Sequence, residues 1–138
     1  MKTITADDFV KSIEDGYPDH HRKAAMGDIF AIYKLAKLYD CGRMFETHNS
    51  WQERRIIGTA HYQKALELYK QGTDQDDPDC WYGLAIMYHT GRWSPDFIPA
   101  GSEHLKEHDL YKECLQRAAA LGLERATKRL ANEEFTTY

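Results

Sequence analysis

The chain has 138 residues, of which 42% are hydrophobic, 29% are charged and 12% are aromatic, and its formal net charge is −4. This length and composition fit one globular domain and exclude a disordered or membrane-spanning chain. Because the sequence has neither a basic stripe nor an apolar stretch typical of a signal peptide, we expect a cytoplasmic protein without a nucleic-acid or membrane partner.

The N-terminal segment, residues 1–27, is expected to cap the fold and to include part of a repeat. Its sequence TADDFVKSIEDG begins at Thr5 and has Asp8 three positions later, which is the spacing of a helical capping box. The run RKAAMGD at residues 22–28 has the form of the end of a second helix.

Two longer segments then share one pattern at an offset of 49 residues. So many identities in one frame are rare by chance, so we interpret the offset as an internal duplication. The identical pairs are Leu35 and Leu84, Ala36 and Ala85, Tyr39 and Tyr88, Gly42 and Gly91, Arg43 and Arg92, Tyr62 and Tyr111, and Leu66 and Leu115.

Each unit is predicted to contain a helix, a connection and a second helix. Apolar residues of the first helix recur at helical spacing in both copies, and Asp28 and the Asp76–Pro78 stretch supply N-terminal caps. Gly42 and Gly91 are placed to end the first helices. The second helices are expected to end at residues 72 and 122.

The expected fold is therefore all-α, a short α-solenoid of antiparallel helix pairs within one domain over residues 1–138. A polar C-terminal helix would cap it. The predicted divisions are a capping segment over 1–27, a first repeat over 28–72, a second repeat over 76–122 and a C-terminal capping helix over 123–138.

This pattern resembles the Sel1-like repeat, a relative of the tetratricopeptide repeat. The matching residues are Ala24, Gly27, Asp28, Ala31, Leu35, Ala36, Tyr39, Gly42, Tyr62, Lys64, Ala65 and Gly72, and in the second copy Leu84, Ala85, Tyr88, Gly91, Leu115, Arg117, Ala118, Ala119 and Gly122. The resemblance implies a binding scaffold or adaptor. The units are longer than is usual for that family, and the extra residues lie at 43–59 and 92–108.

Two regions supply candidate partner contacts. Insertions within repeats usually form loops on one face, often the binding face, and arginine and tryptophan are enriched at interface hot spots. The sequence leaves open whether the two tryptophans contact a partner or fold back onto the core. The candidates are Arg43, Trp51, Arg92 and Trp93 in the insertions, and Tyr33, Lys34, Lys37, Tyr82, Ile86 and His89 on the concave helix face.

Metal, cofactor and catalytic signals are weak. The three cysteines contain no C-x-x-C pair, and Cys80 and Cys114 occupy small-residue packing positions where buried thiols are expected. His104 and His108 would share one side of a helix, but two imidazoles are a weak metal signal. Without nucleotide-binding, hydrolase or metalloprotease motifs, we expect no metal, no cofactor and no enzymatic activity.

The sequence thus predicts a non-catalytic module that binds a protein or peptide through its concave face and insertion loops. One alternative is a cytoplasmic immunity protein that neutralises a bacterial toxin or effector by occluding it. Another is a regulatory or accessory subunit of an enzyme. The chain is expected to be a monomer or a weak homodimer, because two full units and two partial ones are near the minimum for a stable repeat protein.

Overall fold

A computed structural model describes residues 11, 15–41, 51–97 and 101–136, with side chains described at 11, 15–40, 61–97 and 101–132. The regular elements in these ranges are all helical, which confirms the predicted fold class at that level. They are α2 (Pro18–Ala25), α3 (Ile29–Cys41), α4 (Trp51–Thr73), α5 (Pro78–Thr90), α6 (His108–Ala120) and α7 (Glu124–Thr136), with a short 3-10 helix at Glu103–Leu105.

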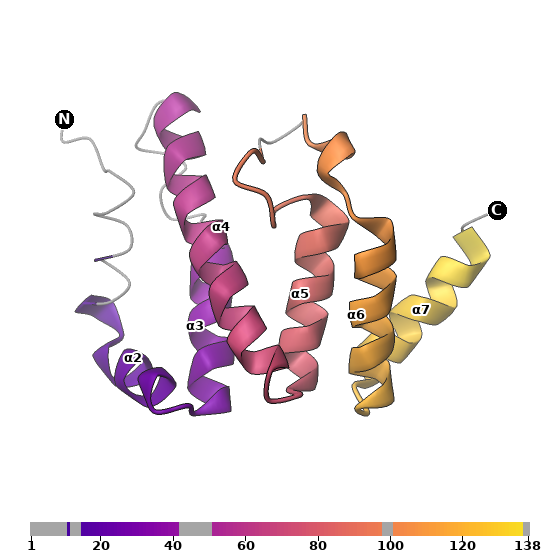
Figure 1. Cartoon of the computed structure of the whole chain (residues 1–138), viewed down its shortest axis with the longest axis horizontal. Coiled ribbons are helices and arrows are strands. Elements are labelled where there is room, and N and C mark those ends of the chain that lie inside the picture. The colour runs from indigo at the N-terminus through magenta and orange to yellow at the C-terminus, as the bar shows by residue number, and fades with distance from the viewer. Residues whose placement is uncertain (1–10, 12–14, 42–50, 98–100, 137–138) are drawn as a thin grey trace.

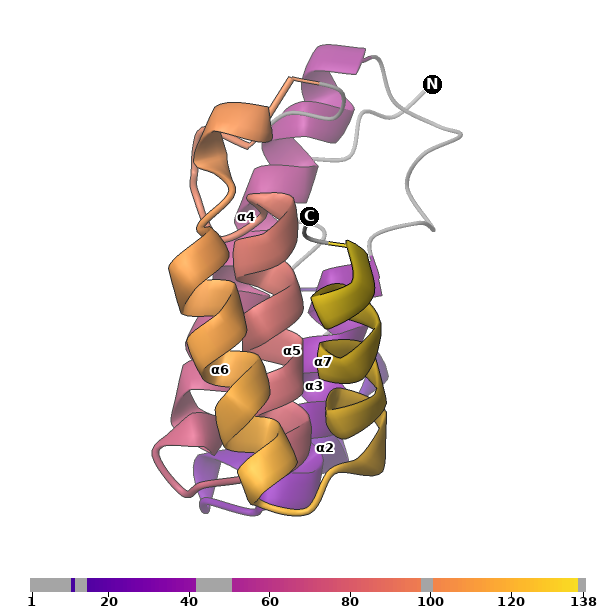
Figure 2. The same ribbon diagram turned by 90° about the vertical axis from the view of Figure 1, so that its right-hand side faces the viewer.

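The helices stand in a row in which each packs against the next along the chain (Figure 1). α2 lies at one end of the row and α7 at the other. Viewed along the row from the α7 end, α6 and α7, which pack against each other, project to either side of α5 (Figure 2). α5 therefore has neighbours on several sides, and its two flanks form different surfaces.

Local chemistry sets the starts of α3 and α5 as the sequence predicts. The carboxylate of Asp28 accepts a hydrogen bond from the Ala31 amide at 3.0 Å, and that of Asp77 accepts one from the Cys80 amide at the same distance. Each bond satisfies an amide that would otherwise lack a partner in the first turn. α5 ends at Gly91, whose φ of 86° suits glycine. Gly42 lies outside the described residues.

The 49-residue offset recurs in the arrangement of helices. α3 and α5 both have 13 residues, and Pro78 stands 49 positions after Ile29. The core is continuous across the row and is formed largely by aliphatic and tyrosine side chains on α3 to α6. Its largest fully buried members are Tyr39, Tyr69, Tyr111, Ile32, Leu35, Met87, Leu115 and Cys80.

Two expectations about local structure are wrong. Residues 51–58 belong to α4 and not to a connecting loop, since Gln, Glu and Arg in WQERR favour a helix. Residues 92–97 and 101–107 of the second insertion lie outside α-helix, as Pro95 favours. His104 lies in the 3-10 helix and His108 opens α6, so the two imidazoles do not share one helix side. The predicted N-terminal capping box, Thr5 and Asp8, lies outside the described residues.

Gly72 lies in the last turn of α4, which ends one residue beyond the expected end at 72. A Cβ at this position would lie 2.6 Å from the Cβ of Cys80, so the glycine allows α4 and α5 to approach closely. Gly122 is the glycine that follows a second helix in the expected way, with a φ of 97° after α6.

A largely buried ion pair joins α3 to the segment after α5. Arg92 donates two hydrogen bonds to the Asp40 carboxylate, each at 3.1 Å, and the two side chains are only 17% and 15% exposed. The Tyr69 hydroxyl of α4 donates to the same carboxylate at 3.1 Å. The Asp40 side chain is therefore a common anchor for groups from α3, α4 and the segment after α5.

His61 lies beside this anchor, and its Nδ1–H donates to the backbone carbonyl of Tyr39. A carbonyl can only accept, so the bond identifies the protonated ring nitrogen. Burial lowers the pKa of His61 below its ordinary 6.5, and the carbonyl bond opposes this only in part. The folded chain therefore favours a neutral imidazole here.

We predict that Arg92→Met lowers the free energy of unfolding by about 2 to 4 kcal/mol, because it leaves the Asp40 carboxylate largely buried without its cation. Urea unfolding measures the loss. Arg117→Met is the matched control, since Arg117 pairs with Asp76 at 3.1 Å but both side chains are about half exposed. The control should lose less than about 1 kcal/mol. Equal losses in the two variants would contradict the anchoring role of Arg92.

Acid should destabilise the chain partly through His61. Below pH 6.5 the unfolded chain binds a proton at this imidazole and the folded chain resists it, so stability falls with falling pH by up to about 1.4 kcal/mol per pH unit. His61→Asn keeps a side-chain donor but does not titrate, so it should lack this contribution between pH 7.5 and 5.5. Urea unfolding at both values measures it, with the exposed His104→Asn as control. An unchanged pH slope in His61→Asn would contradict the prediction.

Candidate interaction surface

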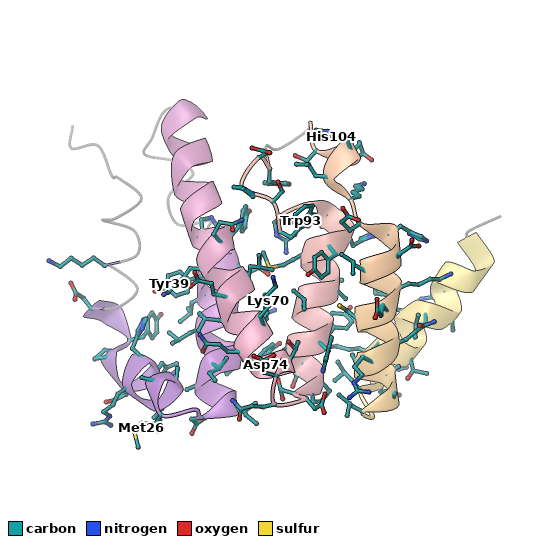
Figure 3. All side chains as sticks on the ribbon, in the orientation of Figure 1. Met26, Tyr39, Lys70, Asp74, Trp93 and His104 are labelled. Atoms are coloured by element: carbon teal, nitrogen blue, oxygen red, sulfur yellow. The ribbon has the colours of Figure 1, made fainter. Side chains whose placement is uncertain are left out.

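The two insertion candidates whose side chains the structure describes, Arg92 and Trp93, form hydrogen bonds with other parts of the chain. Arg92 is fixed by Asp40 and also donates to the Thr90 hydroxyl at 2.9 Å. The Trp93 indole N–H donates to the Leu105 carbonyl at 2.6 Å, and Gln63 of α4 donates to the Trp93 carbonyl at 2.9 Å. Figure 3 shows Trp93 between α4 and the α5–α6 connection.

Trp93 therefore folds back onto the helices, which was one of the two arrangements that the sequence left open. Its ring lies 6.3 Å from that of Tyr88 of α5. Arg43 lies outside the described residues, and so does the side chain of Trp51. Trp93 thus links the α5–α6 connection to α4.

The predicted concave row separates into three environments. Tyr33 of α3 and Tyr82 of α5 meet the same group, the Arg125 guanidinium of α7, which donates to the Tyr33 hydroxyl at 3.3 Å and lies 4.7 Å from the Tyr82 ring centre. Lys34 is exposed and its ammonium lies 5.2 Å from the ring centre of Phe30. Lys37 is exposed as well.

The other two members of the row face the core. Ile86 is half-buried against the core cluster. The His89 ring lies 4.3 Å from the Tyr111 ring, with 30° between their planes. The structure thus brings Tyr33 and Tyr82 into one place and leaves the two lysines on the exposed side of α3.

A second surface, which the sequence did not identify, is an open groove between α5 and α6 with a volume of about 650 Å³. Leu84 and Cys114 are each 5% exposed. Trp81 and Tyr88 contribute from α5, and α6 contributes more exposed side chains. The complete lining is Trp81, Leu84, Tyr88, Leu110, Glu113, Cys114, Gln116, Arg117 and Ala120.

The charges at this groove belong to its margins. Arg117 is half-exposed, pairs with Asp76 at 3.1 Å and places its guanidinium 5.9 Å from the Trp81 ring centre. Glu113 is exposed on α6. Apolar and aromatic surface inside with opposite charges outside is the usual composition of a protein-binding groove.

The buried cysteines are inert thiols, as the sequence predicts. Burial raises the pKa of Cys114 to about 11 and raises that of Cys80 further, so both stay protonated at neutral pH. A protonated thiol is a poor nucleophile and a poor metal ligand. Cys114 therefore contributes apolar surface to the groove.

One sequence signal could have identified the groove. The segment of α5, PDCWYGLAIMYHT, is apolar on nearly every side. A helix of this kind must be covered all round or present an apolar face to something else. Trp81, Leu84 and Tyr88 form such a face, and Leu110 on the opposite wall is 39% exposed.

The described residues contain neither a metal-binding group nor a candidate membrane span. Their His, Cys, Asp and Glu side chains form no group of three that could hold a metal ion. No helix among them is both long and apolar enough to cross a bilayer.

Comparison with known proteins identifies no relative. No protein-family model matches the chain. No curated protein and no solved structure matches it either. The geometry of the two surfaces is therefore the basis for assigning a function.

Proposed function

We propose that this chain is a short α-solenoid of Sel1-like helix pairs that acts as a non-catalytic protein-interaction module. The solenoid is supported by the 49-residue offset between α3 and α5 and by the equivalent caps Asp28 and Asp77. In repeat proteins of this kind, neighbouring units bury a shared core and their surfaces bind other proteins.

The observation that carries the proposal is the open groove between α5 and α6. Its contact residues follow helical spacing on both walls, at 81, 84 and 88 on α5 and at 110, 113, 114 and 117 on α6. Two parallel rows of this kind accept the apolar face of a third helix, as neighbouring helices of the chain accept each other. The expected partner is a protein that presents an amphipathic helix.

The composition of the groove favours binding without catalysis. Its thiol is protonated, and its two charged side chains, Glu113 and Arg117, lie at the margin. Trp81 and Tyr88 supply large rigid contact area, which is the usual source of binding energy at protein interfaces. The same groove would orient a partner helix through its charged margin.

The test uses a displayed library of random 18-residue peptides selected on the unmodified chain. Leu110→Glu places a charge on the groove wall and should weaken the selected peptides by about tenfold or more, as expected for loss of a buried apolar contact. The matched control is Leu121→Glu, because Leu121 is 38% exposed against 39% for Leu110 but lies outside the groove.

The melting temperatures of both variants should stay close to that of the unmodified chain, since both leucines are already partly exposed. Peptides that bind both variants equally well would exclude the groove as the binding site. Failure to select any peptide whose affinity depends on the groove would count against an interaction module.

A further inference from the structure

The C-terminal helix places an arginine in a site formed by α3 and α5. One terminal nitrogen of Arg125 donates to the Asp79 carboxylate at 2.6 Å and to the Tyr33 hydroxyl at 3.3 Å. The guanidinium carbon lies 4.7 Å from the centre of the Tyr82 ring. We call the three receiving residues, Tyr33, Asp79 and Tyr82, the guanidinium cradle.

The chemistry of the cradle suits arginine in particular. The carboxylate forms an ion pair with the guanidinium, and the hydroxyl accepts a second hydrogen bond from it. The aromatic face stacks against the flat, weakly hydrated guanidinium plane. Lysine can form the ion pair but cannot stack in the same way. The geometry is thus selective for one side chain of natural proteins.

The cradle is open to solvent even with Arg125 in place. The Arg125 side chain is 48% exposed and that of Asp79 is 38% exposed. Tyr33 and Tyr82 are both half-buried, so their rings are fixed by packing while their outer edges stay accessible. Another arginine can therefore approach the same groups from outside.

The helix that supplies Arg125 packs against α6 through few apolar side chains in its described part. Among the described side chains of α7, 124–132, Ala126 is the buried one, while Leu130 is half-buried. Arg129 adds a hydrogen bond from Nε to the Tyr111 hydroxyl at 2.7 Å. Arg125 is therefore a tethered occupant held by two hydrogen bonds and one ring face.

We propose that the guanidinium cradle binds an arginine side chain of a basic protein partner, and that Arg125 occupies the cradle in the free chain. The inference rests on the proposed function and adds the chemistry of the partner. The chain carries a net charge of −4, which favours encounter with a basic protein. A tethered arginine competes at an effective concentration on the order of millimolar, so it sets a threshold that a partner must exceed.

The test compares hexa-arginine with hexalysine, two peptides of equal charge, on the full chain and on Arg125→Ala. Binding is measured by isothermal titration and by shifts of the tyrosine ring resonances. Arg125→Ala should bind hexa-arginine about fivefold or more tightly than the unmodified chain, because the tethered competitor is gone. Hexalysine should show no comparable gain.

Two further variants test whether hexa-arginine binds at the cradle. Adding Asp79→Asn and Tyr82→Leu to Arg125→Ala should abolish the gain, because these changes remove the carboxylate and the ring. Arg22→Ala removes the same charge from an exposed ion pair with Asp19 in α2 and should give no gain.

The proposal is overturned if Arg125→Ala binds hexa-arginine no more tightly than the unmodified chain, if hexalysine gains equally, or if the gain survives loss of Asp79 and Tyr82. Thermal melts of all variants show whether α7 is displaced. Melting of the fold in Arg125→Ala would shift the comparison to Arg125→Met, which keeps the apolar stem and removes the guanidinium. If the cradle proposal is overturned while peptides selected on the groove still bind these variants, the proposed function of the groove remains supported.

Discussion

The Asp40 carboxylate is the point on which the middle of the row depends. It lies in the last turn of α3, accepts a hydrogen bond from the Tyr69 hydroxyl of α4 and accepts two from the Arg92 guanidinium in the segment after α5. Charges that are this far buried are stable only while they are paired, so all three helices are held in one relative position. That position sets Trp93 against Leu105 and Gln63 and thereby fixes where α6 begins beside α5. α6, which forms the second wall of the groove, begins where the α5–α6 connection ends.

The parts of the fold that the sequence predicted are those that depend on neighbouring residues. Asp28 and Asp77 cap their helices through amides three positions away, and Gly91 ends α5 because its left-handed backbone suits glycine. Arg92 was predicted as a partner contact from its residue type and its place in an insertion. Its own partner, Asp40, is 52 residues away, and no local pattern connects the two. The close approach of Gly72 to Cys80 could not be predicted for the same reason, since that thiol belongs to the next helix.

The candidate surfaces were predictable only in part. Tyr33 and Tyr82 were identified from their equivalent places in the two units, and one guanidinium does join them. The sequence could not supply that group, because Arg125 belongs to a helix 92 residues further along the chain than Tyr33. The groove was missed because Leu84, Tyr88 and Cys114 match the apolar pattern of a core. Whether an apolar helix face is covered depends on where the neighbouring helices lie, which periodicity does not contain.

The two surfaces use opposite sides of α5. Asp79 and Tyr82 contribute to the guanidinium cradle, and Trp81 and Leu84 contribute to the groove. Trp81 stands two positions after Asp79, and Leu84 stands two positions after Tyr82. Two positions are about 200° around a helix. Figure 2 accordingly shows α7 on the cradle side and α6 on the groove side. A helix bound in the groove would leave Arg125 in place, so the two sites should bind independently unless a single partner extends around α6 and α7 to reach both.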